Sequence, residues 1–187
     1  VHKQGYQDEQ ILDNSFEASA QTEQKILQDK NVSGVTPRLE SFALASSADI
    51  TKGCLLVGIQ PEKENEITKL KSKLTEFFFF FFNDDAVLLL QGLAERLKLK
   101  LNDTIILIGQ GYHGATAAGK YRIKGILKFG SPELNDKALF MPLHAAQDFY
   151  SADGMISSYI LSLHNTKNLE ATAAMVRTPL GNTYEVL

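Results

Sequence analysis

The segment Gly109–Tyr121, which reads GQGYHGATAAGKY, constrains the fold most strongly because it contains two overlapping nucleotide-binding patterns. Its first three glycines match G-x-G-x-x-G. The stretch that begins at the third glycine matches G-x-x-x-x-G-K, with Tyr121 where Ser or Thr is usual. Both patterns hold phosphate only where a strand, a glycine turn and the N-terminus of a helix follow one another. The residues on either side therefore decide between a nucleotide site and a plain turn.

The flanking residues predict a β-hairpin. Thr104–Ile108 is a β-branched, apolar run typical of a strand. Beyond the glycines, apolar residues stand at alternate positions from Tyr121 to Phe129, interrupted only by Gly125, and basic residues stand among them. This period of two indicates a strand rather than a helix. We interpret the segment as strand, oversized loop and strand, and a nucleotide-dependent enzyme that uses Gly109–Tyr121 becomes the least favoured of three hypotheses.

Composition and charge narrow the class of protein. Of the 187 residues, 44% are hydrophobic and 22% are charged, as in an ordinary globular domain. The formal net charge of -3 provides no electrostatic reason for nucleic-acid binding. The longest apolar runs, Phe77–Phe82 and Ala86–Leu90, are far shorter than the ~20 residues of a membrane-spanning helix. Cys54 is the single cysteine, and its apolar neighbours predict a buried side chain.

No group of residues predicts catalysis. The histidines His2, His113, His144 and His164 show no spacing typical of a zinc site, and no nucleophile motif is present. His144 and Asp148 share a helical face at i, i+4, which is more typical of a surface hydrogen bond than of a metal site. We therefore expect no catalytic residue, no cofactor and no metal, which favours a binding or coupling module.

The first third of the chain predicts the order β-α-β. Val1–Tyr6 is a short candidate strand, and Asn14 with Glu17 resembles a capping box that opens a helix to about Lys30. After a turn, Val35–Leu44 and Leu55–Ile59 are expected to be strands.

The remainder predicts a strand-rich middle and a second β-α-β run. A charged helix is expected over Pro61–Leu74, and another helix opens at Pro142. The other expected elements are strands at Ala86–Leu90, Ala138–Met141, Ile156–Leu163 and Thr183–Leu187, and helices at Gly92–Leu99 and Asn168–Arg177. The fold class is α+β, with two β-α-β halves that pack as one sheet with helices on one face, and the middle as an insertion.

Phe77–Phe82 leaves an alternative open. Six consecutive phenylalanines are too apolar to stand in water, so we expect most of the rings to be buried. The rival interpretation is a contact for lipid or an apolar partner. It supports a second hypothesis, a stand-alone extracytoplasmic binding domain for an apolar ligand.

Four stretches follow one another in an informative order: Val87–Leu90, Gly92–Leu97, Asn102–Asp103 and Ile123–Ile126. This succession resembles the extracytoplasmic domain of ABC-transporter permeases of the MacB/FtsX type, which include LolC and LolE. In that family a strand reading VLLG leads into a helix reading GLAxxLGLxxGD, and a strand pair ends in VVGI. The likeness is best over about residues 53–150.

The resemblance implies a two-part domain that is not an enzyme. Residues 1–45 and 153–187 would form a porter-like subdomain, and residues 46–152 an inserted, β-rich Sabre-like subdomain. Transmembrane helices flank the domain in the family. This agrees with a chain that starts at Val1 without methionine and stops at Thr183–Leu187, a strand-like run with no polar tail, as expected for an excised piece of an inner-membrane protein.

The family also implies partners. They are a cytoplasmic ABC ATPase subunit or domain, a second permease copy, and a periplasmic carrier or adaptor protein. ATP hydrolysis would be coupled to export or release of a lipoprotein, peptide or amphiphile outside the inner membrane. In the LolC branch a projecting hairpin loop binds the carrier. Here the loop at that place would offer Gln110, Tyr112, His113 and Thr116 as partner-binding residues.

Overall fold

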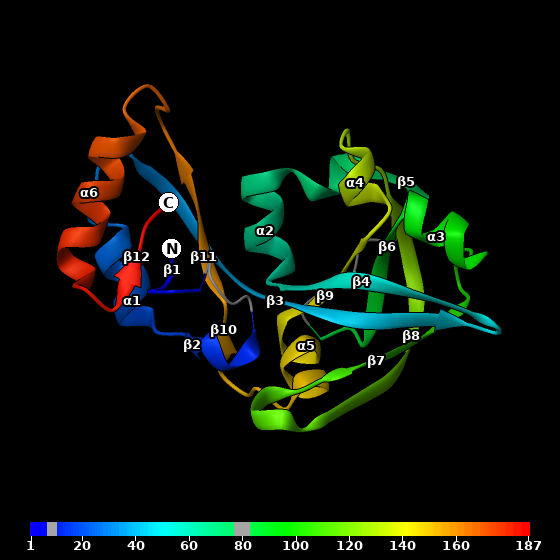
Figure 1. Cartoon of the computed structure of the whole chain (residues 1–187). Helices are drawn as coiled ribbons and strands as arrows, with labels where there is room; N and C mark the ends of the chain where they lie inside the picture. The colour runs from blue at the N-terminus through cyan, green and yellow to red at the C-terminus, as the bar shows by residue number, and fades with distance from the viewer. Residues whose placement is uncertain (7–10, 77–82) are drawn as a thin grey trace.

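A computed structural model describes residues 1–6, 11–76 and 83–187 of the chain (Figure 1). Its elements in chain order are β1 (His2–Lys3), the 3₁₀ turn η1 (Leu12–Asn14), β2 (Phe16–Glu17), α1 (Ala20–Ile26), β3 (Val32–Ser47), β4 (Ile50–Ile59), α2 (Pro61–Thr68), η2 (Leu70–Lys73), β5 (Leu74–Glu76), β6 (Ala86–Leu90), α3 (Gln91–Leu97), β7 (Thr104–Gln110), η3 (Tyr112–Gly114), β8 (Thr116–Leu127), α4 (Pro132–Asn135), β9 (Ala138–Pro142), α5 (Leu143–Tyr150), β10 (Met155–Ile156), β11 (Ser158–Leu163), α6 (Leu169–Leu180) and β12 (Tyr184–Glu185). Among the described residues, no helix has the length and apolar character needed to span a bilayer.

Six strands form a closed, mixed β-barrel. Around the ring, β3 pairs with β4, β4 with β9, β9 with β6, β6 with β8, β8 with β7, and β7 again with β3. The β4–β9 and β6–β8 pairs are parallel, and the other four are antiparallel. Because the ring closes, its strands expose no long free edge to solvent. We call these strands, with α2, α3, α4 and α5, the barrel region.

Large aliphatic side chains from β4, β6, β7 and β9 fill the barrel interior, and β3 contributes Ala43 and Ala45. Leu56, Leu89, Leu107 and Leu139 are fully buried in one cluster. Helix α5 packs against β3, β4, β8 and β9, and it approaches so closely that a Cβ atom on Gly58 would lie 2.5 Å from the Ala146 methyl carbon. The barrel core therefore extends into α5 on the side of Gly58.

The two ends of the chain extend the same sheet beyond the barrel, along the first part of β3. The first part of β3 pairs with β11, β11 pairs with β1 at one residue, and β1 pairs with β12. Helices α1 and α6 contact each other beside this sheet, and β2 pairs with β10 (Figure 1). We call η1, β1, β2, β10, β11, β12, α1, α6 and the first part of β3 the terminal region. Strand β3 runs through both regions.

An ion cluster lies at the middle of β3, where the two regions meet. The Arg38 guanidinium donates to both carboxylate oxygens of Glu64 on α2, at 3.1 and 2.6 Å, and to Glu40 at 3.2 Å. The Glu64 side chain is only 1% exposed. Burial acts to lower the pKa of Arg38, but the hydrogen bonds and charges of Glu64 and Glu40 raise it overall. The cluster attaches α2 to the shared strand.

Most predicted elements are confirmed, with two corrections near their ends. The capping-box prediction at Asn14 is wrong, because Phe16–Glu17 forms a strand and α1 begins only at Ala20. The buried Phe16 ring packs against the rings of Tyr159 and Tyr184, so a tertiary contact overrode the local signal. The Pro61–Leu74 helix ends at Thr68, where Lys69 adopts a left-handed conformation with φ 55°. Phe77–Phe82 lies outside the described residues.

Candidate partner-binding site

The hairpin predicted from the glycine-rich segment is present, but its loop is short. Strands β7 and β8 pair without interruption from Thr104 opposite Arg122 to Gln110 opposite Thr116. Only residues 111–115 lie outside the ladder, so the prediction of an oversized loop was wrong. The alternation of buried and exposed residues continues into the segment that was predicted to be loop, where Ala117 is buried. A strand follows the glycines where a phosphate site needs a helix, so neither nucleotide pattern has its structural context here.

Glycine is required where the turn begins. The Gly111 N–H donates to the Ala115 carbonyl at 2.6 Å. A Cβ atom on Gly111 would lie 2.6 Å from the carbonyl oxygen of Tyr150, which is backbone and cannot swing away. Gly114 has φ +78°, a region that side chains disfavour. These contacts fold the turn back against α5.

The hairpin tip contacts the terminal region through Asp13 of η1. The His113 backbone N–H donates to the Asp13 carboxylate at 3.1 Å, and the His113 ring nitrogen Nδ1 lies 3.7 Å from the same oxygen. His113 has φ 51°, an unusual backbone conformation for a residue other than glycine, and the Asp13 contact stabilises it. The tip therefore bridges the two regions.

The four predicted partner-binding residues differ in exposure. Gln110, His113 and Thr116 are exposed, and His113 is the most solvent-facing polar residue of the turn with 73% of its side chain accessible. Tyr112 is half-buried and packs against the main core, with its ring centroid 3.9 Å from that of His113. Tyr112 thus anchors the tip, and the other three side chains face solvent.

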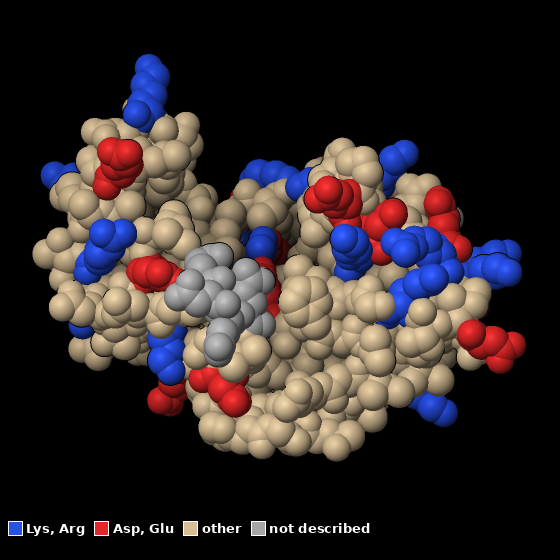
Figure 2. All heavy atoms as spheres, in the orientation of Figure 1, with Lys and Arg blue, Asp and Glu red and all other residues tan. Residues whose placement is uncertain are grey.

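Sequence reasoning missed an apolar surface beside the tip. Phe42, Leu44 and Ile108 are 63%, 50% and 46% exposed on the outside of the barrel. Leu44 and Ile108 lie directly opposite each other across the β3–β7 pair. Figure 2 shows that the surface over β7 and the hairpin is almost entirely free of Lys, Arg, Asp and Glu side chains. We call Phe42, Leu44 and Ile108 the apolar seam.

The apolar seam adjoins the tip through a small hollow. A cavity of about 240 Å³ is lined by side chains and backbone from η1, β3 and the hairpin, including Asp13, Phe42, Gln110 and Gly111. Part of the missed signal was in the sequence: β3 reads Phe42-Ala-Leu-Ala45, so large and small residues alternate. Such an alternation separates the two faces of a strand, but it does not show which face is buried. Here the alanines Ala43 and Ala45 face the interior.

The described residues offer no catalytic centre. No group of three or more His, Cys, Asp or Glu side chains among them is arranged to hold a metal ion. Burial raises the pKa of the Cys54 thiol to about 12. Burial, with smaller contributions from Asp85 and Asp148, raises the pKa of Tyr121 to about 12. Both groups therefore stay protonated near neutral pH, and the predicted burial of Cys54 is confirmed.

This architecture is that of extracytoplasmic domains of ABC-type transporters. The extracellular domain of the noncanonical ABC-type transporter YknZ from Gram-positive bacteria superposes with a TM-score of 0.65 at 16% identity, covering 92% of this chain and 89% of that one. The periplasmic region of MacB from Actinobacillus actinomycetemcomitans superposes with a TM-score of 0.62 at 11% identity, covering 97% and 83%. At such identities the likeness shows the fold alone.

The family follows from the sequence itself. The chain belongs to the MacB-like periplasmic core domain family, whose sequence model matches residues 4–178. No curated protein sequence matches the chain significantly. The protein is thus an extracytoplasmic domain of a MacB-like ABC-transporter permease. This domain is a non-catalytic region of the permease. The family resemblance inferred from the sequence is confirmed.

Proposed function

We propose that this domain couples ATP hydrolysis by a cytoplasmic ABC ATPase to export or release of a substrate outside the inner membrane. We further propose that it contacts a periplasmic carrier or adaptor protein through the hairpin tip and the apolar seam. The observation that carries the contact proposal is the exposure of Phe42, Leu44 and Ile108 beside the tip. Contiguous exposed apolar side chains are typical of protein–protein contact sites.

In this proposal the two parts of the surface have different roles. The apolar seam supplies the area removed from water, which is the main favourable term in association. Gln110, His113 and Thr116 supply hydrogen-bonding groups at its border, as in the polar rim of protein interfaces. The contact of His113 with Asp13 holds this border in place before the partner arrives.

The mechanical proposal rests on how the two regions are joined. Residues 1–45 and 153–187 would act as a porter-like part and residues 46–152 as a Sabre-like part, within a permease that works with a second copy. Both chain ends lie side by side in the terminal region, where β1 pairs with β12 (Figure 1). A displacement of the ends would reach the barrel through β3, the Arg38 cluster and the Asp13–His113 contact.

The test uses serine substitutions in the full-length transporter. We expect Leu44→Ser with Ile108→Ser to weaken partner cross-linking and transport by tenfold or more, because each removes about 2 kcal/mol of transfer free energy. His113→Ala should have a smaller effect. The matched control is Met175→Ser, since Met175 is 64% exposed on α6, away from the hairpin. If the seam variant and the control variant lowered cross-linking and transport equally, the apolar seam would not be the partner contact.

A further inference from the structure

A polar hollow of about 490 Å³ lies where α5 packs against β8 (Figure 1). It shares no lining residue with the smaller hollow beside the apolar seam. The polar groups that line it are two carboxylates, three hydroxyls and one imidazole, from Asp85, Asp148, Thr116, Tyr121, Ser151 and His144. No described Lys or Arg lines it, so two negative charges face at most the one positive charge of the imidazole. We call it the acidic hollow.

The two carboxylates of the acidic hollow are not used within the described structure. Asp84, the residue before Asp85, pairs with Lys124 at 2.6 Å. By contrast, no described residue forms an ion pair or a hydrogen bond with the side chain of Asp85 or of Asp148. Exposed carboxylates by themselves are ordinarily hydrated. A neighbouring phenol sets this pair apart.

The Tyr121 phenol is a buried polar group without a partner. The residue lines the acidic hollow and is only 9% exposed, and its hydroxyl forms no hydrogen bond with any described residue. Most buried hydroxyls are hydrogen-bonded, because leaving one unsatisfied costs free energy. Burial, and after it the charges of Asp85 and Asp148, raise the pKa of the phenol to about 12. The hydroxyl therefore stays protonated near neutral pH, and its oxygen can accept from a donor that enters the hollow.

Two neighbours hold the phenol in this position. The Tyr121 ring packs edge-to-face against Phe149, with ring centroids 6.1 Å apart and an interplanar angle of 76°. On the strand side, a Cβ atom on Gly119 would lie 2.7 Å from the Tyr121 hydroxyl oxygen. The ring thus occupies the space that a side chain at this position would need. Gly119 belongs to the second nucleotide-binding pattern, and here its missing side chain makes room for a tyrosine rather than for a phosphate.

The groups around the acidic hollow suit a planar organic cation better than a metal ion. Among the described parts of the chain, no three His, Cys, Asp or Glu side chains are arranged to hold a metal ion. A guanidinium has five N–H donors in a rigid plane, so it can donate to carboxylates and to a phenol oxygen together. Its flat face also stacks on aromatic rings, and Phe149 lines the hollow. An ammonium group has three donors on a point charge and no flat face.

We propose that the acidic hollow binds a guanidinium group, carried by an arginine of a partner polypeptide or by a small organic cation. The guanidinium donates to the carboxylates of Asp85 and Asp148 and to the hydroxyl oxygen of Tyr121. Thr116 and Ser151 offer further acceptors at the rim, where both are exposed. The proposal requires no contact at the apolar seam, so it stands or falls separately from the proposed function.

The first test is a titration of the full-length transporter with Nα-acetyl-arginine methylamide, followed by ligand-observed NMR. The matching citrulline derivative is the control probe, since it has the same shape but a neutral urea in place of the guanidinium. We expect saturable binding of the arginine derivative, about tenfold tighter than that of the citrulline derivative, because charge-assisted hydrogen bonds are the stronger ones. Equal binding of the two probes, or no saturable binding of the arginine derivative, would overturn the proposal.

The second test asks whether the binding takes place in the acidic hollow. Asp85→Asn with Asp148→Asn should weaken binding of the arginine derivative about tenfold, because an exposed ion pair contributes up to about fivefold. Tyr121→Phe keeps the ring on Phe149 and should weaken binding about threefold, with unchanged thermal unfolding. Glu133→Gln removes an exposed carboxylate of α4 that does not line the hollow, and it should leave binding unchanged. If either hollow variant binds as tightly as this control, the proposal is wrong.

The third test separates the two sources of the guanidinium. Propylguanidinium carries the same charged group without a peptide backbone. If the arginine derivative binds at least as tightly, the acidic hollow takes an arginine of a polypeptide; if propylguanidinium binds more tightly, it takes a small cation. Either result supports guanidinium binding. The matching lysine derivative should bind more weakly than the arginine derivative, and equal binding of these two would contradict the choice of a guanidinium.

Discussion

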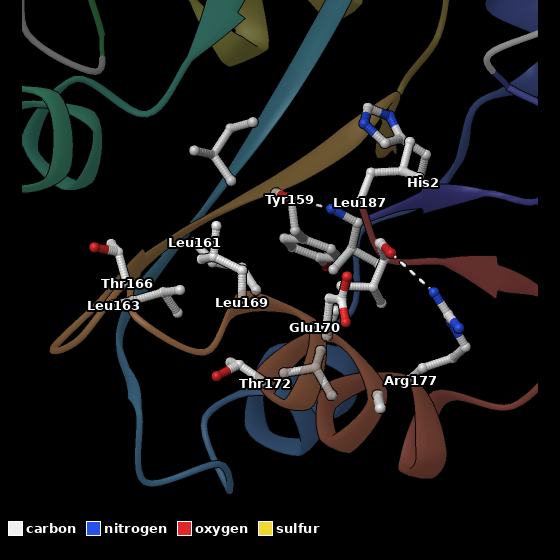
Figure 3. Close-up of a pocket in the computed structure, with 16 residues that line it drawn as sticks. His2, Tyr159, Leu161, Leu163, Thr166, Leu169, Glu170, Thr172, Arg177 and Leu187 are labelled. Atoms are coloured by element: carbon white, nitrogen blue, oxygen red, sulfur yellow. Dashed lines mark hydrogen bonds between the residues drawn. The ribbon is translucent and has the colours of Figure 1, made fainter.

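In the barrel region, six strands pair in a ring and share one buried core. In the terminal region, β11 pairs with the first part of β3 and with β1, and α1 and α6 pack against each other beside them. A hollow of about 720 Å³ lies between β11 and α6 in the terminal region (Figure 3). We infer a division of roles: the closed barrel, with its shared buried core, supplies more of the stability than the terminal region.

The largest expected contrast is between two leucines. Leu89→Ala in the barrel should lower the free energy of unfolding by about 3 kcal/mol, because Leu89 is fully buried and the substitution leaves a cavity. Leu161→Ala in the terminal region should cost about 1 kcal/mol, because Leu161 is only partly buried beside an existing hollow. Urea unfolding followed by circular dichroism measures both. Similar losses would contradict the division of roles.

The junction between the regions should show the next largest effect. Glu64→Gln leaves the partly buried Arg38 guanidinium with Glu40 as its remaining carboxylate, and we expect a loss of about 2 kcal/mol. Glu62→Gln on the exposed face of the same helix is the matched control and should change stability little. The same urea titration compares them. If the two variants lose equal stability, the ion cluster does not join α2 to the shared strand.

At the hairpin tip we expect a smaller effect. Gly111→Ala brings a methyl group against the Tyr150 carbonyl and should cost about 1 to 2 kcal/mol of unfolding free energy. Gly53→Ala on β4 is the control, because a Cβ atom there meets nothing within 4 Å. Thermal unfolding monitored by circular dichroism distinguishes them. Gly111→Ala should also lower partner cross-linking in the full-length transporter, whereas Gly53→Ala should leave it unchanged.

The smallest expected effect is a pH dependence of the terminal region. Burial lowers the pKa of His2 below 6.5, although a backbone hydrogen bond at Ser157 and the charges of Glu40 and Glu185 act in the opposite direction. The unfolded chain therefore binds a proton more readily than the folded one, so stability falls as the pH drops below about 6.5. His2→Gln should flatten this fall by less than about 1 kcal/mol. An unchanged slope in His2→Gln would show that His2 does not titrate differently on folding.

Much of the fold could be predicted because several segments carry unambiguous local signals. Ala86–Leu90 and Ala138–Met141 are short apolar runs between turn residues, and both are buried strands. The alternation after Tyr121 separated a hairpin from a nucleotide site. The start of α1 could not be predicted, because Phe16 is held by distant aromatic rings rather than by its neighbours. Closure of the barrel depends on the β3–β7 pair, whose partners lie some sixty residues apart in sequence.

The candidate site was predicted in part. Periodicity placed Gln110, His113 and Thr116 near a hairpin end, where they are exposed. It could not show that Asp13, about a hundred residues away, fixes the backbone of His113. Nor could it show that Phe42 and Leu44 face outward, because only the narrow barrel interior decides that Ala43 and Ala45 point inward.

The sequence by itself therefore determined the α+β class, the hairpin at the glycines, the lack of catalytic motifs and the resemblance to MacB-type permease domains. These features depend on local periodicity and on residue types, and both can be recognised from neighbouring positions in the sequence. Only the tertiary structure decided how the ring closes, which face of β3 is buried and what supports the tip. Each of these depends on contacts between residues far apart in the chain, and no local pattern records them.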